Sequence, residues 1–260
     1  MTNRIPDFLA APSSAEARAA LADLAGLCAL AYEKPATIKA ALPRAIYRSD
    51  RKTDTQLYVV NRKVLGIECR LAVFRGTQVS AGWSWTDILR NFRLGFMDWP
   101  PAGPGGGRVH SGYGKAILAV DGPTLTDLFH RGGKPVIVTG HSLGGALATL
   151  ALDLPGMGAA IGVTFGAPAV GDAAFNARVA DRLIRVVVHR DIAPRHPRWW
   201  LGYRQPGPEY IRLEHDGRAR LAKWGWADNL YIPFTSRGAL HGKADHRVGV
   251  YRALAAPPDD

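Results

Sequence analysis

A serine stands between two glycines where a short apolar run gives way to a helix-forming run. The stretch is V-I-V-T-G-H-S-L-G-G-A-L-A-T-L, residues 136–150. A sharp strand-to-helix turn pushes the hydroxyl of Ser142 out above the sheet edge, and Gly140 and Gly144 let the strand and the helix pass closely. The backbone N–H of Leu143 then lies at the helix N-terminus, where a negative charge is stabilised. The pattern predicts a nucleophile, Ser142, beside an oxyanion donor, Leu143.

A serine hydroxyl is a weak nucleophile and needs a base. In α/β-hydrolases the order along the chain is Ser, then acid, then His. Downstream of Ser142, the apolar run R-V-V-V-H-R-D ends in Asp191, and A-D-H-R-V contains His246. We expect His246 to take the proton of the serine and Asp191 to orient the imidazole.

Other histidines compete for the role of the base. His241 lies near His246 in the sequence and is the alternative. His141 adjoins the nucleophile, but a residue beside the serine in such a turn should point away from it. His110 precedes the serine and falls outside the expected chain order.

The acid also has alternatives. Asp172 and Asp181 both follow Ser142 and precede His246. Asp245 directly precedes the histidine, so we expect it to cap or pair locally rather than to support the imidazole.

A second oxyanion donor should come from an earlier strand-to-loop junction. The run Phe74-Arg75-Gly76-Thr77 fits, because an apolar strand stops at Gly76 and a hydroxyl residue follows. We expect the backbone N–H of Thr77 to meet that of Leu143. Each such donor typically contributes about 3 kcal/mol in the transition state.

The elements that must position these residues are strands alternating with helical segments. The expected strands are 57–60, 66–74, 135–140, 161–165 and 183–189, with a hairpin of 210–214 and 220–222. The expected helices are 112–130, broken or kinked near Gly122-Pro123, and 143–152. This order predicts an α/β protein, a single domain over residues 1–260, with a mainly parallel sheet flanked by helices. Chemistry in such sheets gathers at the carboxyl ends of the strands.

Several stretches, in order from about Phe74 to Tyr251, together resemble the class 3 lipases. The matching motifs are F-R-G-T at 74–77, V-H-S-G-Y at 109–113, G-H-S-L-G-G at 140–145, T-F-G-A-P-A-V-G-D at 164–172, D-I-A-P at 191–194 and D-H at 245–246. The chain departs from the family pattern at Gln205, where histidine is frequent, and at Tyr251, which comes two residues late. Both departures fall on the expected wall beside His246.

The resemblance implies an α/β-hydrolase fold and serine ester hydrolysis, often of a lipid substrate, without a metal or an organic cofactor. A phospholipase A1 or an acyltransferase on the same three residues is the alternative, and a catalytically inactive lipid-binding scaffold is a more distant one. The resemblance also implies a lid after Thr77, within residues 78–108. Its expected apolar face is Trp83, Trp85, Ile88, Leu89 and Phe92.

Tryptophan is confined to two windows of the sequence. The first holds Trp83, Trp85 and Trp99, the second Trp199, Trp200, Trp224 and Trp226. Indoles suit a lipid interface, because they join an apolar body to a polar edge. We expect both windows to overhang the site. Ordinary core packing is the alternative.

The net charge is +11 at 260 residues, and the basic excess is concentrated late in the chain. Such a surplus favours an anionic lipid surface. The basic residues are scattered and form no nucleic-acid motif, so nucleic-acid binding is not expected. No apolar run is long enough to cross a bilayer.

The N-terminal region reads as part of the fold and not as a secretory leader. Acidic and basic residues interrupt any apolar core, and Ser13 and Glu16 have capping-box spacing. We therefore expect a cytoplasmic protein or one exported without a leader. Cys28 and Cys69 lie in apolar surroundings and are expected to be buried, reduced thiols.

Overall fold

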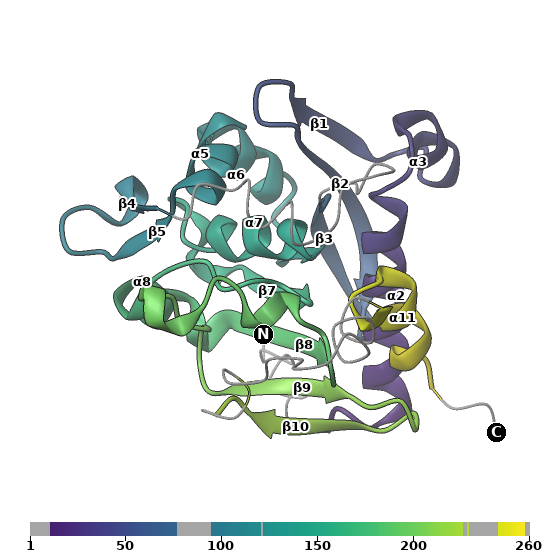
Figure 1. The fold of residues 1–260 in the computed structure, drawn as a ribbon. Helices are drawn as coiled ribbons and strands as arrows, with labels where there is room; N and C mark the ends of the chain where they lie inside the picture. Colours follow the sequence, from purple (N-terminus) through teal and green to yellow (C-terminus); the bar gives the residue numbers. More distant parts are fainter. Residues whose placement is uncertain (1–10, 77–94, 121, 226–227, 229–243, 258–260) are drawn as a thin grey trace.

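The computed structural model describes residues 11–76, 95–120, 122–225, 228 and 244–257 (Figure 1). Within these ranges lies a sheet of eight strands in the order β1-β2-β3-β6-β7-β8-β9-β10. The strands are β1 (Ile46–Asp50), β2 (Thr55–Val64), β3 (Ile67–Phe74), β6 (Val136–His141), β7 (Ile161–Phe165), β8 (Leu183–Val188), β9 (Glu209–Leu213) and β10 (Ala219–Lys223). Pairing is parallel from β3 through β9 and antiparallel at both edges.

Helices cover both faces of the sheet. They are α2 (Ala15–Leu30), α3 (Pro35–Ala41), α5 (Ser111–Ala119), α6 (Gly122–His130), α7 (Leu143–Ala151), α8 (Ala173–Val179) and α11 (Val248–Ala255). Figure 1 shows α2, α3 and α11 on one side and α5, α6 and α7 on the other. The α/β fold class with a mainly parallel sheet is therefore confirmed.

Alternation along the strands divides the core into two layers. On β2, Leu57 and Val59 pack toward α5, α6 and α7, whereas Tyr58 and Val60 pack toward α2. The central strands β6 and β8 are buried along their whole length, as expected where helices cover both faces. In the described ranges no helix is both long enough and apolar enough to span a membrane.

Several expected boundaries shift. The turn between the first two predicted strands is only two residues long, Leu65 and Gly66, because β2 continues to Val64. The N-cap of α2 is Ser14, whose hydroxyl accepts from the N–H of Ala17 at 3.2 Å, and not Ser13. Both cysteines are free and buried, as predicted.

Residues 96–110 form a small hairpin of β4 (Phe96–Asp98) and β5 (Arg108–His110), joined through the 3₁₀ turn η1 (Pro100–Ala102). Trp99 is only 1% exposed, and its indole N–H donates to Asp153 Oδ2 at 2.9 Å. The expectation that Trp99 overhangs the site is thus wrong, because the indole anchors this hairpin in the core.

Candidate active site

The turn that carries Ser142 lies where β6 ends at His141 and α7 begins at Leu143. Ser142 has φ 61° and ψ −127°, a backbone conformation that residues other than glycine rarely adopt. Its N–H donates to the carbonyl of Phe165 on β7 at 2.9 Å, and its carbonyl accepts from the N–H of Ala146 at 3.1 Å. Strain of this kind costs about 1–3 kcal/mol and persists only where neighbours enforce it.

Glycine is required on both sides of the serine. A Cβ at Gly140 would collide with the backbone of Gly144, and a Cβ at Gly144 would collide with the carbonyl of Phe74. The sharp turn and the end of β3 are therefore in direct contact. This is the close packing of strand and helix that the sequence pattern predicts.

His246 and Asp191 meet although they lie 55 residues apart. The Nδ1 atom of His246 is 2.9 Å from Asp191 Oδ1 and 2.8 Å from Oδ2, and both residues are buried. The ring centre of His246 lies 4.7 Å from that of His141, the neighbour of Ser142. The fold thus brings the predicted base and acid together beside the serine turn.

The hydroxyl of Ser142 is buried and makes no hydrogen bond to any of the residues that the structure describes. Hydrogen bonds between a nucleophile and its base are often long without a substrate and tighten only in the reacting complex. The present arrangement is therefore compatible with a catalytic serine that engages its base on substrate binding.

Two further donors converge on the carboxylate of Asp191. The hydroxyl of Tyr251 donates to Oδ2 at 2.5 Å, and the N–H of Ala193 donates to Oδ1 at 2.8 Å. Burial and the nearby Asp191 charge raise the pKa of Tyr251 well above its ordinary value, so the phenol stays a donor. The N–H of Val188 in turn donates to the Tyr251 oxygen at 3.1 Å. These contacts fix the orientation of the carboxylate.

His141 supports the backbone of His246. Its Nε2 is 2.7 Å from the carbonyl oxygen of His246, and its Nδ1 is 2.8 Å from the hydroxyl oxygen of Tyr32. Burial, with a smaller effect of His246, holds the pKa of His141 well below its ordinary value. A neutral ring that donates to the carbonyl of His246 and accepts from Tyr32 fits both distances. Sequence reasoning missed Tyr32 altogether, because no local pattern connects it to the site.

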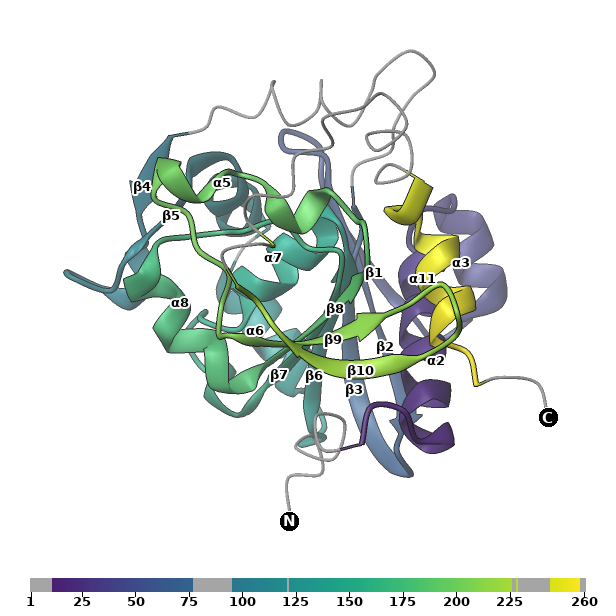
Figure 2. The same ribbon diagram turned by 60° about the horizontal axis from the view of Figure 1, so that its bottom comes forward.

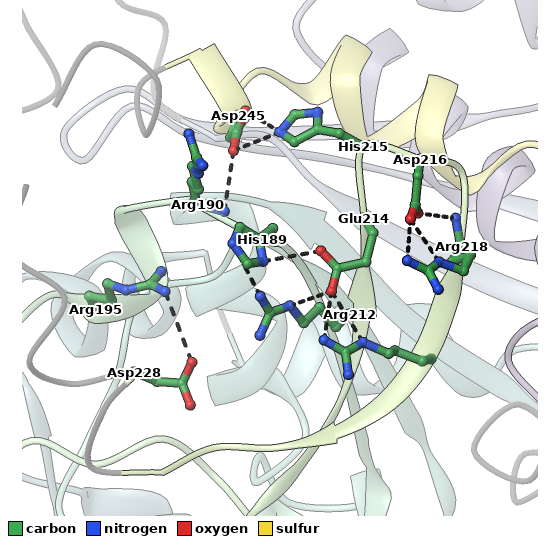
Figure 3. Close-up of polar contacts among 11 residues, drawn as sticks. His189, Arg190, Arg195, Arg212, Glu214, His215, Asp216, Arg218, Asp228 and Asp245 are labelled. Carbon is green, nitrogen blue, oxygen red and sulfur yellow. Dashed lines mark hydrogen bonds and ion pairs between the residues drawn. The ribbon is translucent and has the colours of Figure 1, made fainter. Parts of the chain in front are cut away.

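Asp245 ties the His246 segment to the Asp191 segment (Figure 3). Its Oδ2 accepts from the N–H of Arg190 at 3.2 Å, and its Oδ1 lies 3.1 Å from Nε2 of His215. Asp245 and Arg190 directly precede the two paired residues, so this bridge lies one residue outside the His246–Asp191 contact. The prediction that Asp245 caps or pairs locally was therefore wrong, because its partners lie 55 and 30 residues away in the sequence.

Removing this bridge should loosen the pair. Asp245→Ala removes a carboxylate that is only 5% exposed and accepts from the N–H of Arg190. We expect the free energy of unfolding to fall by about 2 kcal/mol and kcat on a soluble ester to fall about tenfold. Denaturant unfolding and steady-state kinetics measure the two effects.

Asp216→Ala is the matched control, since Asp216 pairs with Arg218 in the same region but both side chains are exposed (Figure 3). This control should leave both quantities unchanged. Equal stability and equal kcat of the two variants would show that the contacts of Asp245 contribute no more than those of an exposed carboxylate.

The alternative partners that the structure describes lie elsewhere. Asp172 caps α8 by accepting from the N–H of Phe175 at 3.1 Å, and Asp181 is exposed beside Arg182. His110 caps α5, accepting from the N–H of Gly112 at 3.1 Å, and stacks on Tyr113. His241 lies outside the described residues.

His110 should make stability depend on pH. Burial lowers the pKa of His110 to about 4, whereas an unfolded chain protonates histidine near pH 6.5. Between these values the unfolded chain binds a proton that the folded protein excludes, so stability is present above pH 6.5 and is lost as the pH falls. The expected loss from this ring is up to roughly 3 kcal/mol at pH 4.

Denaturant unfolding of wild type and His110→Gln between pH 7 and pH 4 measures this slope. The variant should be less stable at pH 7 but should lose less stability on acidification. His130→Gln, at an exposed histidine, should keep the wild-type slope. Equal slopes for wild type and His110→Gln would contradict a neutral buried ring.

Leu143 begins α7, and the first N–H groups of a helix have no intrahelical partner. Thr77, the second predicted donor, lies outside the described residues, as do the predicted lid residues Trp83, Trp85, Ile88, Leu89 and Phe92. The residue before Thr77 is placed: a Cβ at Gly76 would collide with Tyr32 and lie 2.7 Å from the carbonyl oxygen of His141. The chain thus leaves β3 beside the serine turn.

A pocket of about 600 Å³ lies away from the paired residues, between α8 and the segment after β8. Gln205 lines it and donates from Nε2 to the carbonyl of Pro194 at 2.6 Å. Gln205 thus braces the segment after Asp191. In the described ranges no three His, Cys, Asp or Glu side chains are grouped so as to hold a metal ion.

Known proteins share both the sequence and the fold. The lipase (class 3) family profile matches residues 71–200. The Rhizomucor miehei lipase is 34% identical over 183 aligned positions, and the alignment covers 63% of this chain and 48% of that protein. The Rhizopus niveus lipase is 36% identical over 182 aligned positions, and the alignment covers 63% of this chain and 45% of that protein. The chain spans about half the length of the curated relatives it matches.

A solved structure of the Rhizomucor miehei triacylglyceride lipase superposes with a TM-score of 0.71 at 25% identity, covering 93% of this chain and 98% of that one. A structure of lipase II from Rhizopus niveus superposes with a TM-score of 0.66 at 24% identity. This superposition covers 88% of this chain and 92% of that one. The profile covers half of the 260 residues and includes the serine turn, so the resemblance noted in the motifs is confirmed. The chain belongs to the class 3 lipase family.

Proposed function

We propose that this protein hydrolyses carboxylic esters of lipids, with Ser142 as nucleophile, His246 as general base and Asp191 as the supporting acid. The observation that carries this proposal is the buried His246–Asp191 pair, with contacts of 2.8 and 2.9 Å, next to a serine turn with φ 61°. A strained serine and a carboxylate-bound imidazole are the parts that acyl transfer needs.

In the first half-reaction the hydroxyl of Ser142 attacks the ester carbonyl while Nε2 of His246 takes its proton. The tetrahedral oxyanion accepts from the N–H of Leu143 at the start of α7. When the intermediate collapses, His246 returns the proton to the leaving alcohol and an acyl-serine remains. Asp191 stabilises the imidazolium throughout, since its carboxylate faces Nδ1.

In the second half-reaction a water molecule takes the place of the alcohol. His246 removes a proton from this water as it attacks the acyl carbonyl, and then returns the proton to Ser142. The products are a free carboxylic acid and the restored enzyme. No step in this cycle calls for a metal or an organic cofactor.

We assign the second oxyanion donor to the backbone N–H of Thr77. The position of Gly76 beside the carbonyl of His141 supports this assignment. Ser142 is fully buried, so an ester can reach its hydroxyl only after covering structure moves. Within the predicted range 78–108, Trp99 anchors the hairpin of β4 and β5 in the core. We therefore propose that the part before this hairpin supplies the moving segment, with Trp83, Trp85, Ile88, Leu89 and Phe92 as its apolar face.

The charge distribution supports an anionic lipid surface as the place where substrate is met. Between Arg178 and Arg252 the chain has 15 Lys plus Arg and 7 Asp plus Glu, a surplus of 8 positive charges (15 − 7). Basic residues near a negatively charged membrane contribute about 1 kcal/mol each.

Covalent labelling tests the proposal. A fluorophosphonate should modify wild type once, on the peptide containing Ser142, and should not modify Ser142→Ala. Hydrolysis of triacylglycerol to free fatty acid supports the lipase assignment. Lysophospholipid as the main product would make it a phospholipase A1, and transfer to an alcohol would make it an acyltransferase. A labelled peptide from elsewhere, or none, would overturn the proposal.

A further inference from the structure

Three consecutive large apolar side chains are exposed on the 3₁₀ turn η5 (Trp199–Leu201). The exposed fractions are 42% for Trp199, 55% for Trp200 and 44% for Leu201. In the part of the chain that the structure describes, the other large apolar side chain with a comparable exposed fraction is Leu221 on β10, at 40%. We call residues 199–201 the tryptophan turn. The two indoles lie edge to face, with ring centres 6.1 Å apart, so the exposed apolar groups adjoin one another. Exposed apolar surface rimmed by polar residues can mark an interaction site.

The tryptophan turn is held in place from both sides. Before it, the carbonyl of His196 accepts from the N–H of Ala169 at 2.8 Å, and after it the N–H of Arg204 donates to the carbonyl of Gly171 at 3.0 Å. The guanidinium of Arg204 donates to the carbonyl of Trp199 at 2.6 Å. The indoles therefore project from an ordered support, so little ordering entropy is lost when they engage a partner.

Positive charge lies beside the turn. Residues 192–208 contain three arginines and no acidic residue. Arg195 is buried and lies 4.0 Å from Asp228, so Arg198 and Arg204 are the two that can supply charge to the surface. The guanidinium carbon of Arg198 lies 5.5 Å from the ring centre of Trp200, and Arg204 is exposed. Indoles flanked by arginines match a negatively charged lipid interface, where the rings enter the headgroup region and the guanidinium groups meet phosphate.

The tryptophan turn also lies on the face of the molecule where the paired residues meet. In Figure 2 the green segment after β8 and the first turn of α11, which follows His246, lie on the same upper side. Tyr203, just after the turn, stacks on Phe96 at 4.2 Å and lies 5.9 Å from His110. A lipid surface at the turn would therefore face the carboxyl ends of the parallel strands.

We propose that the tryptophan turn docks this protein on the surface of an anionic lipid aggregate. Trp199, Trp200 and Leu201 enter the interface, while Arg198 and Arg204 bind its negative headgroups. The inference rests on the proposed function in one respect, namely that lipid is the substrate class. Docking itself requires no turnover and can be measured in a protein that lacks the nucleophile.

The experiment measures vesicle binding by co-sedimentation in the Ser142→Ala protein, with phosphatidylglycerol-rich and pure phosphatidylcholine vesicles. Leu201→Ser and Leu221→Ser form a matched pair, because they remove the same side chain at similar exposure, 44% and 40%. Arg204→Gln and Arg48→Gln form the second pair. Both arginines are exposed and donate to a backbone carbonyl, but Arg48 lies on the distant edge strand β1.

Leu201→Ser and Trp200→Ser should each weaken binding to anionic vesicles about tenfold, because an apolar side chain no longer leaves water. Arg204→Gln should weaken it about fivefold at low salt, and the difference should shrink at high salt. Leu221→Ser and Arg48→Gln should bind like the parent. Melting curves identify any variant that fails to fold, and the remaining members of the pairs keep the comparison decisive.

Three results would overturn the docking surface. One is equal binding by Leu201→Ser and Leu221→Ser. The second is equal affinity of the parent for anionic and neutral vesicles at low salt. The third is a dimer in sedimentation that Leu201→Ser dissociates, which would assign the turn to a second copy of this chain. Hydrolysis of a soluble ester by wild type tests the chemistry separately, so either proposal can fail alone.

Discussion

Ser142→Ala is expected to lower kcat for ester hydrolysis by a factor of about 10⁵ to 10⁶. Loss of the nucleophile removes the acyl-enzyme route, and only oxyanion stabilisation and substrate binding remain. The fold should survive, because the hydroxyl makes no hydrogen bond to the described residues and alanine fits the same space. Steady-state kinetics on a soluble ester and denaturant unfolding give the two measurements.

Ser49→Ala serves as the control, at an exposed serine on β1, and should hydrolyse the ester like wild type. Retention of more than about 1% of wild-type kcat by Ser142→Ala would exclude Ser142 as the nucleophile. A fall in stability comparable to that of a core substitution would show instead that the hydroxyl is structural.

Asp191→Asn is expected to lower kcat by about 10⁴. Three donors converge on the two carboxylate oxygens: Nδ1–H of His246, the hydroxyl of Tyr251 and the N–H of Ala193. Asparagine replaces one acceptor with a donor, so either Tyr251 loses its acceptor or the imidazole adopts the wrong tautomer. In serine proteases the corresponding change has an effect of this size.

The same substitution should also reduce the free energy of unfolding by about 2 kcal/mol, because one buried donor is left unsatisfied. Asp172→Asn is the matched control, a carboxylate that caps α8 and was an alternative acid in the sequence. It should leave kcat unchanged. A larger loss of kcat in Asp172→Asn than in Asp191→Asn would transfer the acid role to Asp172.

The serine turn and the sheet around it could be predicted from sequence because their signals are local. Strand β7 matches the predicted range 161–165, and β6 and α7 match to within a residue. Each consists of a buried apolar run with small residues at its end. The motif order Ser, acid, His then selected Asp191 and His246. In the fold, Nδ1 of His246 lies 2.8 Å from Oδ2 of Asp191.

Short edge elements were not predicted. Strand β1 (Ile46–Asp50) is partly exposed and polar, and the hairpin of β4 and β5 has three residues in each strand. These segments are strands because they pair with a neighbouring strand. Their own sequences show no alternation of apolar and polar residues that would predict a strand. Trp99 shows the same limit, because its burial depends on Asp153, which is 54 residues away.

The contacts that support the paired residues also lay beyond sequence reasoning. Tyr32 reaches His141 across 109 residues, and His141 reaches the backbone of His246 across 105. Tyr251 stands out of step with the family pattern, yet its hydroxyl binds Asp191. Helix α11 places the hydroxyl of Tyr251 beside Asp191. The number of residues between His246 and Tyr251 does not predict this contact.

The sequence by itself determined the fold class, the serine turn and the residues that pair beside it. Hydrophobic periodicity and glycine positions act over a few residues and are visible in the chain. The tertiary structure alone decided that Tyr32, His141, Tyr251 and Asp245 support the pair, and that Trp99 is buried whereas Trp200 is exposed. Such choices depend on contacts between segments far apart in the chain, which leave no local pattern.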